Sequence, residues 1–334
     1  MTTVSMAVAR RMIIACYRKN VPLMLTGYPG MGKTATYESV ARELGIGFID
    51  FRLGLKDPVD VGGMRVPDAK TGKLRHYVPD DLPDAERDGA AGIILFDEIN
   101  AVAQMMQTTA YGLIQERRIG KWRMPEGWVP MAAGNNVSDR AAAQRMSTAL
   151  ANRFLHADVA PDLEYWVDNY GLANCPDAGI SFLRFRPALF HVMPKPDEKA
   201  FPSARSWTAA FRFLDEEPTL RRALIAGEVG DAAADELEGF LQIRASAVTL
   251  AEILADPKGC RLPPKDKPAV SYAVSGMLAN AMTRKTAAPI IEYAGRLGPE
   301  YEVLIAHDAQ KRDKTIANTS AFGAWAVRNQ EVVL

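Results

Sequence analysis

The chain has 334 residues with 40 basic (Lys plus Arg) and 40 acidic side chains, so no global excess of positive charge favours nucleic acid or an acidic membrane surface. Cys16, Cys175 and Cys260 lie far apart without C-x-x-C spacing, which argues against a disulfide framework or a zinc site and favours a reducing, cytoplasmic location. No segment approaches the roughly 20 apolar residues of a membrane span. The length allows two domains or one large one with a lid, and the 48% hydrophobic content supports a sizeable core.

The opening residues predict a helix, a strand and a glycine-rich turn. Apolar side chains recur at helical spacing over residues 4–19, and residues 21–25 form a short apolar run. The run leads into GYPGMGKT, which has the form G-x-x-x-x-G-K-T, and a helical pattern over residues 35–44 follows. An apolar strand before the motif and a helix after it form the context in which this motif binds phosphate.

The motif has a chemical rationale. Glycines let the backbone wrap so that successive N–H groups point at phosphate oxygens, and Lys33 adds positive charge at the β and γ phosphates. Thr34 would place its hydroxyl on Mg²⁺, and the amino end of the following helix would face the same phosphates. The residues expected to contact the nucleotide here are Gly27, Tyr28, Pro29, Gly30, Met31, Gly32, Lys33, Thr34 and Ala35.

Further strands are expected along the first half of the chain. Residues 46–53 predict a second strand, and residues 64–66 and 74–78 flank a turn and predict an inserted hairpin. Residues 93–96 predict a buried parallel strand that ends in Asp97 and Glu98. We expect this strand to neighbour the strand before the glycine-rich turn. Asp97 would then hold Mg²⁺ through water, and Glu98 would accept the proton of an attacking water, whereas the alternative is two solvated acids.

The remaining strands complete an α/β domain. A helix is expected over residues 103–115, followed by a second hairpin whose arms, residues 119–124 and 128–133, flank residues 125–127. The second arm would continue as a core strand that ends at Asn135, where an amide can orient water or contact the γ phosphate; the alternative is a turn residue. With residues 154–159 as a fifth strand, we predict a doubly wound, five-stranded parallel sheet in a domain spanning residues 1–160.

Beyond residue 162 the pattern becomes helical. Helices are expected over residues 163–170, 180–190, 204–214, 232–255 and 270–284, and residues 161–334 are predicted to form an all-α region. Arg153, before the fifth strand, and Arg205, opening a helix of the second domain, read as surface charges on composition alone. Basic and aromatic residues alternate within the second hairpin, a pattern that could bind single-stranded nucleic acid or form amphipathic arms. This basic and aromatic stretch comprises Arg117, Arg118, Lys121, Trp122, Arg123 and Trp128.

The segments GYPGMGKT, IILFDEIN, MAAGNN, LANRF and PSARSW, in this order and spacing, resemble the AAA+ ATPases. DEIN followed by a glutamine-rich helix and ERRIG resembles the MoxR branch in particular, and the resemblance covers roughly residues 20–215. It implies a Walker A pair and a Walker B pair. It also implies a sensor 1 asparagine, an arginine finger that reaches a neighbouring subunit, and a sensor 2 arginine. The Walker A pair would be Lys33 and Thr34, and the Walker B pair Asp97 and Glu98. Sensor 1 would be Asn135, the arginine finger Arg153, and sensor 2 Arg205.

The resemblance implies a Mg²⁺-dependent ATPase that assembles as a ring, expected to be a hexamer, and remodels or matures a protein partner. Within the MoxR-like branch such partners often carry von Willebrand factor A domains. The alternatives are a nucleic-acid-acting AAA+ loader or initiator and a nucleotide switch that is not a motor. Tyr28 and Asn136 depart from the usual pattern, and residues 216–334 match no motif.

Overall fold

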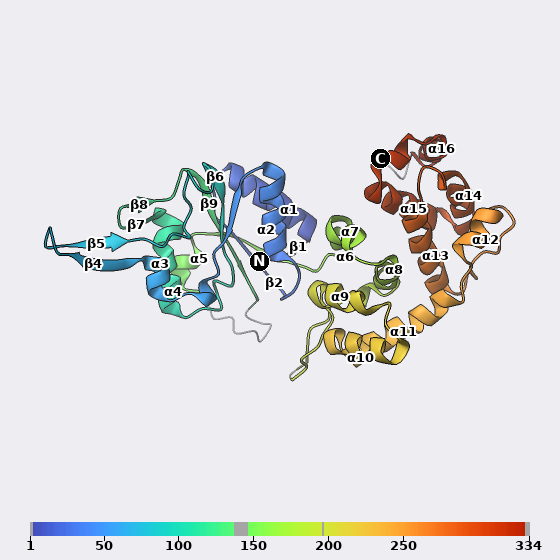
Figure 1. Cartoon of the computed structure of the whole chain (residues 1–334), viewed down its shortest axis with the longest axis horizontal. Helices are drawn as coiled ribbons and strands as arrows, with labels where there is room; N and C mark the ends of the chain where they lie inside the picture. Colours follow the sequence, from blue (N-terminus) through green and yellow to red (C-terminus); the bar gives the residue numbers. More distant parts are fainter. Residues whose placement is uncertain (1–2, 137–145, 196, 331–334) are drawn as a thin grey trace. The chain divides into compact units, whose positions relative to one another are not determined.

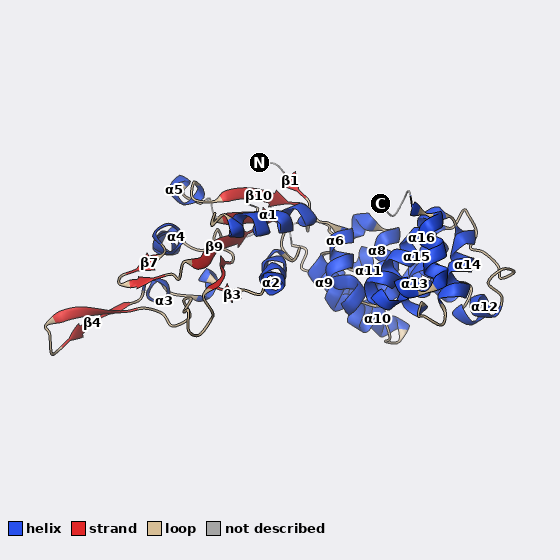
Figure 2. Ribbon diagram, turned by 90° about the horizontal axis from the view of Figure 1, so that it is seen from above, coloured by secondary structure: helices blue, strands red, loops and turns tan. Residues whose placement is uncertain are grey.

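The computed structural model describes residues 3–136, 146–195 and 197–330, and the chain divides into two compact units, Met1–Asp162 and Leu163–Leu334 (Figure 1). The first unit contains a parallel sheet with helices on both faces. The second unit is helical (Figure 2). In the described part of the chain, no helix combines the length and the apolar character that crossing a membrane requires.

The sheet of the first unit has six strands, all parallel. The five strands predicted from the sequence are confirmed, and a two-residue strand is added at one edge, where it pairs with residues 158 and 159. Two residues are too short to give a detectable alternation of apolar side chains. In spatial order the strands are β1 (Thr3–Val4), β10 (Leu155–Val159), β2 (Leu23–Gly27), β9 (Gly127–Gly134), β6 (Ala91–Phe96) and β3 (Gly47–Asp50).

The strand order corrects one expectation. The strand that leads to Asp97, β6, does not neighbour β2, because β9 lies between them and Ala132 of β9 is in register with Met24 on one side and Phe96 on the other. Local sequence patterns identify strands but do not report which strands pair. The consequence is that the end of β9, and with it Asn135, lies between the glycine-rich turn and the acids.

Helices cover both faces of this sheet (Figure 1). One face packs against α1 (Met6–Arg18) and α2 (Lys33–Leu44), and the other packs against α3 (Pro58–Gly62), α4 (Gln104–Tyr111) and α5 (Thr148–Ala151). Side chains alternate between the faces along each strand, so that Ile94 and Phe96 join the core under α4. The sheet is therefore doubly wound, and burial on both faces explains why its central strands are almost entirely apolar.

Two hairpins project from this framework. The first, β4 (Met64–Asp68) with β5 (Lys73–Tyr77), is confirmed where the sequence predicts it. The second consists of β7 (Arg118–Ile119) and β8 (Trp122–Arg123), so its turn lies at residues 120–121. The prediction that residues 119–124 pair with residues 128–133 is wrong, because β9 uses both of its edges in the parallel sheet.

The second unit contains eleven α-helices in its described residues. The prediction of one helix over residues 232–255 is wrong, because Thr249 accepts a hydrogen bond from the N–H of Glu252 and starts a new helix there. The helices are α6 (Leu163–Trp166), α7 (Leu172–Asn174), α8 (Asp177–Phe185), α9 (Ala204–Ala210), α10 (Pro218–Val229), α11 (Asp231–Ala245), α12 (Leu250–Ala255), α13 (Pro268–Ala281), α14 (Ala287–Leu297), α15 (Pro299–Arg312) and α16 (Ser320–Arg328).

Helix α13 joins the two hydrophobic clusters of the second unit. Ala273 contributes to the cluster that contains Trp207, whereas Val274 and Leu278 contribute to the cluster that contains Ile290. A helix that is apolar on all sides is typically buried, as α13 is between α8 and α15. The second unit therefore has a continuous helical core.

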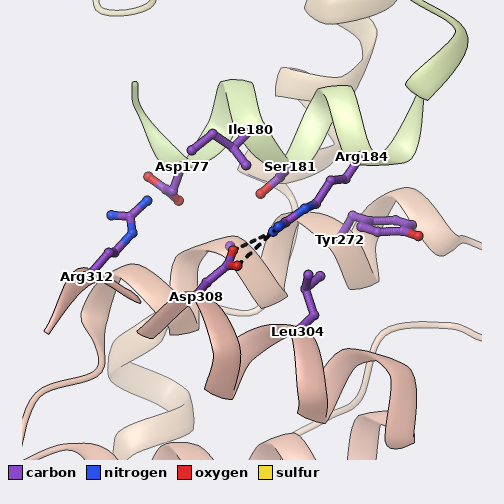
Figure 3. A pocket seen from close by; sticks show the side chains of 9 residues that line it. Asp177, Ile180, Ser181, Arg184, Tyr272, Leu304, Asp308 and Arg312 are labelled. Carbon is purple, nitrogen blue, oxygen red and sulfur yellow. Dashed lines mark hydrogen bonds and ion pairs between the residues drawn. The ribbon is translucent and has the colours of Figure 1, made fainter. Parts of the chain in front are cut away.

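A buried ion pair connects α8 to α15 (Figure 3). The guanidinium of Arg184 donates to Asp308 at 2.5 and 3.2 Å and to Glu164 at 2.8 Å. Burial would raise the pKa of Asp308, but hydrogen bonds from His307 and Arg184 outweigh it and lower that pKa. The adjacent crevice has a volume of about 10 Å³, which is room for about one water molecule, so this charged cluster is structural.

We expect Asp308→Ala to destabilise the chain by about 3–5 kcal/mol, because the guanidinium of Arg184 would remain buried without its buried partner. Chemical denaturation followed by tryptophan fluorescence measures this loss. The matched control is Asp235→Ala, which breaks an exposed pair with Arg222 and should change stability by less than about 0.5 kcal/mol. The difference should shrink as the pH falls below about 4, the usual pKa of an aspartate, and toward the lower pKa of Asp308 in the folded chain, because protonation removes the charge that pairs with Arg184. Equal losses in the two variants would contradict this role.

Candidate functional site

The glycine-rich turn connects β2 to α2 at the carboxyl edge of the sheet. Gly30 and Gly32 have φ angles of 76° and 89°, a left-handed conformation that favours glycine. Gly32 is also the N-cap of α2 and has no side chain to bond the first N–H groups of the helix. These N–H groups and the helix dipole are therefore available to an anion.

Lys33 bends back into this turn. Its buried ammonium donates to the carbonyl oxygens of Gly27 at 2.9 Å and Tyr28 at 2.8 Å, and to Oδ1 of Asn135 at 3.2 Å. A buried charge requires such acceptors because it has lost its water. The three contacts place the ammonium beside the turn and the end of β9.

The other predicted nucleotide contacts lie in the same turn and in the first turn of α2. Three of them, Gly27, Met31 and Lys33, are buried, and Gly32 and Ala35 are exposed. The remaining four are half-buried: Tyr28, Pro29, Gly30 and Thr34. The sequence thus predicted a contiguous segment that the fold keeps together.

Thr34 and Asp97 are in direct contact. Oγ1 of Thr34 donates to Oδ2 of Asp97 at 2.6 Å, and Oδ1 of Asp97 accepts from the N–H of Glu98 at 2.9 Å. Among the described residues there is no cluster of three or more His, Cys, Asp or Glu side chains that could hold a metal alone. Mg²⁺ in nucleotide sites needs only one or two protein oxygens beside phosphates and water, so a hydroxyl and a carboxylate in contact fit this ion.

Glu98 has an unusual backbone. Its φ angle is 54°, a left-handed conformation that costs a non-glycine residue roughly 1–2 kcal/mol. The N–H of Ala101 donates to the carbonyl of Glu98 at 2.8 Å, and Ile99 is fully buried, so the turn is held on both sides. The side chain of Glu98 is exposed beside Asp97, where a carboxylate can receive a proton from water.

Two residues near the site were missed by the sequence reasoning. Asn100 is buried and donates from Nδ2 to the carbonyl oxygen of Asn135 at 2.6 Å. Arg52 follows β3 and donates to Asp50 at 2.7 Å; this bond, with the charges of Asp50, Asp97 and Glu98, raises its pKa. The available signal was a polar side chain within an apolar stretch, which alone does not distinguish a functional residue from a surface one.

Arg153 lies at the amino ends of the strands, opposite the end of the sheet that carries the glycine-rich turn. It precedes β10, which runs from Leu155, in register with Leu23, to Val159, in register with Gly27. Its guanidinium stacks on the ring of Tyr111, 3.8 Å from the centroid, and donates to Oε1 of Gln115 and the carbonyl of Ala149. The structure therefore does not bring Arg153 to the glycine-rich turn of its own chain.

Arg205 belongs to the second unit. It lies exposed in the first turn of α9, which is capped by a hydrogen bond from the N–H of Ser206 to the side chain of Ser203. This cap begins the helix at the predicted residue.

The basic and aromatic stretch does not form one exposed strip. Trp128 is fully buried and donates to the carbonyl of Gly89 at 2.9 Å, so it has no free face for a base. Arg117 donates to Asn20, and Arg118 pairs with Glu116 at 2.8 Å. These contacts account for part of the stretch as structural, and they weaken the case for stacking of single-stranded nucleic acid.

A doubly wound parallel sheet, a glycine-rich turn before a helix, and an acid at the end of another strand define a P-loop nucleotide-binding domain. Residues 23–118 match the family described as ATPase family associated with various cellular activities (AAA). This part of the chain is therefore an ATPase domain of the AAA family.

Solved structures share only a distant likeness. A protein from Cytophaga hutchinsonii, provisionally assigned as an ATPase, is 14% identical with a TM-score of 0.36 over 91% of this chain and 79% of its own. NtrX from Brucella abortus in complex with ATP is 12% identical with a TM-score of 0.36 over 100% of this chain and 69% of its own. Likenesses this weak carry no argument about this chain. A search of curated proteins finds no significant match.

We expect Lys33→Ala to weaken ATP binding about 10- to 150-fold, because charge-assisted hydrogen bonds contribute about 1.5–3 kcal/mol. Titration with a fluorescent ATP analogue measures the affinity, and circular dichroism verifies folding. The matched control is Lys121→Ala, which removes the same charge from the exposed turn between β7 and β8. Unchanged affinity in Lys33→Ala would remove the phosphate-binding assignment from this turn.

Proposed function

We propose that the chain is a MoxR-like AAA+ ATPase that assembles as a ring, in the simplest case a hexamer, and uses ATP hydrolysis to remodel or mature a protein partner. A protein with a von Willebrand factor A domain is the partner class that the MoxR-like motifs favour. The proposal rests on those motifs and on the division of the candidate catalytic residues between the two edges of the sheet.

The position of Arg153 is the observation that supports assembly into a ring. The length of β10 from Leu155 to Val159, which is level with Gly27, is four residue steps, or roughly 13 Å at about 3.3 Å per step. The side chain of Arg153 contacts Tyr111 and Gln115 on its own chain. An arginine in this place cannot reach the nucleotide of its own P-loop, so it supports a role at the nucleotide of a neighbouring copy.

The residues at the carboxyl edge have complementary roles in this proposal. Lys33 and the N–H groups of the turn bind the phosphates, and Thr34 and Asp97 would hold Mg²⁺, an ion that would supply positive charge there. Glu98 accepts the proton of the attacking water and Asn135 orients that water. Arg205, which the motifs assign as sensor 2, would add positive charge at the phosphates.

We expect Glu98→Gln to bind ATP with near-normal affinity but to lower turnover about 10²- to 10⁴-fold, because an amide cannot accept the proton of water. A coupled phosphate-release assay and a nucleotide titration separate the two effects. Glu116→Gln is the matched control, since it makes the same change at an exposed carboxylate that pairs with Arg118. Wild-type turnover in Glu98→Gln would mean that another group is the base.

Mixed assemblies test the role of Arg153. A trans arginine contributes roughly 10³- to 10⁵-fold to turnover, so Arg153→Ala alone should be nearly inactive. When Arg153→Ala and Glu98→Gln chains are mixed, interfaces that combine an intact Glu98 with an intact Arg153 should recover part of the phosphate release. Full activity of Arg153→Ala, or no recovery in a mixture that light scattering shows to be co-assembled, would contradict the proposal.

A further inference from the structure

Asn100 occupies a buried position between the two polar strand ends of the site. Its side chain is 5% exposed, and Nδ2 donates to the carbonyl oxygen of Asn135 at 2.6 Å. Within the described residues, Oδ1 of Asn100 has no hydrogen-bond partner and lies only 2.3 Å from where a Cβ on residue 134 would stand. Gly134 therefore leaves room for this amide, whose Nδ2 is held by the carbonyl oxygen of Asn135.

Asn100 also belongs to the turn that carries Glu98. The N–H of Ala101 donates to the carbonyl of Glu98, and the N–H of Ile99 donates to the carbonyl of Ala133 at 3.3 Å. Two hydrogen bonds thus join the turn after β6 to the end of β9. One comes from the main chain of Ile99 and the other from the side chain of Asn100. Asn135 in turn accepts from Lys33.

We propose that Asn100 is a positioning residue for ATP hydrolysis: its amide fixes the main chain of Asn135 relative to Glu98, so that both side chains meet the same water. This inference rests on the proposed function and extends it to a residue outside the glycine-rich turn and the acidic pair. Asn100 acts through Asn135. Lys33 keeps its bonds to Gly27 and Tyr28 without it, so phosphate binding should not depend on Asn100.

The test uses Asn100→Asp, which nearly preserves volume but removes the donor while the acid is ionised. The new carboxylate would face the carbonyl oxygen of Asn135 and repel it, which would displace the side-chain amide of Asn135. We expect kcat to fall about 10- to 100-fold, since misplacement of a group by about 1 Å can lower the rate about 10²-fold. KM for ATP should change less than about threefold. Burial raises the pKa of a carboxyl introduced here.

The pH profile separates positioning from a loss of structure. As the pH falls through the pKa of the introduced acid, the protonated group can donate to Asn135 again, so kcat relative to wild type at the same pH should rise. Asn100→Ala should show a deficit that does not recover. The matched control is Gln107→Glu: Gln107 is an equally buried amide that donates to the carbonyl of Val102 at 3.1 Å, so its variant should lose stability without this kcat profile.

The outcomes are distinct. A wild-type kcat in Asn100→Asp, or a deficit equal to that of Gln107→Glu at every pH, overturns the inference while leaving the ATPase proposal intact. A raised KM with unchanged kcat also overturns it. A folded wild-type chain that releases no phosphate overturns the proposed function and the inference together.

Discussion

The buried ammonium of Lys33 is the constraint on which the site depends. Its acceptors include carbonyl oxygens at the end of β2 and Asn135 after β9, and the contact with Asn135 requires these two strands to be neighbours in the observed register. The same register places β6 on the other side of β9. Asp97 is then reached from α2 through Thr34, rather than from an adjacent strand. One desolvated charge thereby links the strand order to the chemistry at the edge of the sheet.

Local patterns were sufficient for much of the fold and the site. Composition and spacing over a few residues predict the turn from Gly27 to Lys33, the acid after β6 and the amide after β9. The position of β9 between β2 and β6, and the contact of Asn100 with Asn135, depend on residues far apart in sequence. The second hairpin was misplaced because an apolar segment such as β9 reads the same in a hairpin and in a parallel sheet.

The second unit shows the same limit in helical form. Its helical character follows from periodicity, but the break before Leu250 depends on a capping interaction between Thr249 and Glu252 that a continuous apolar pattern conceals. The pairing of Arg184 with Asp308 joins residues on α8 and α15, and neither residue has a neighbour in sequence that predicts it. Such pairs are selected by packing, so a single sequence contains no local signal for them.

The stack of Arg153 on Tyr111 has a consequence for assembly. A free arginine side chain has about 2 kcal/mol of rotamer entropy to lose when it is immobilised, whereas a stack at an exposed site is worth only about 0.5–1 kcal/mol. The stack alone therefore holds the guanidinium weakly, and hydrogen bonds to Gln115 and Ala149 complete its ordering. If a neighbouring copy presents a phosphate there, part of the rotamer entropy has already been lost, so the guanidinium exchanges neutral acceptors for an anionic one with little further loss of freedom.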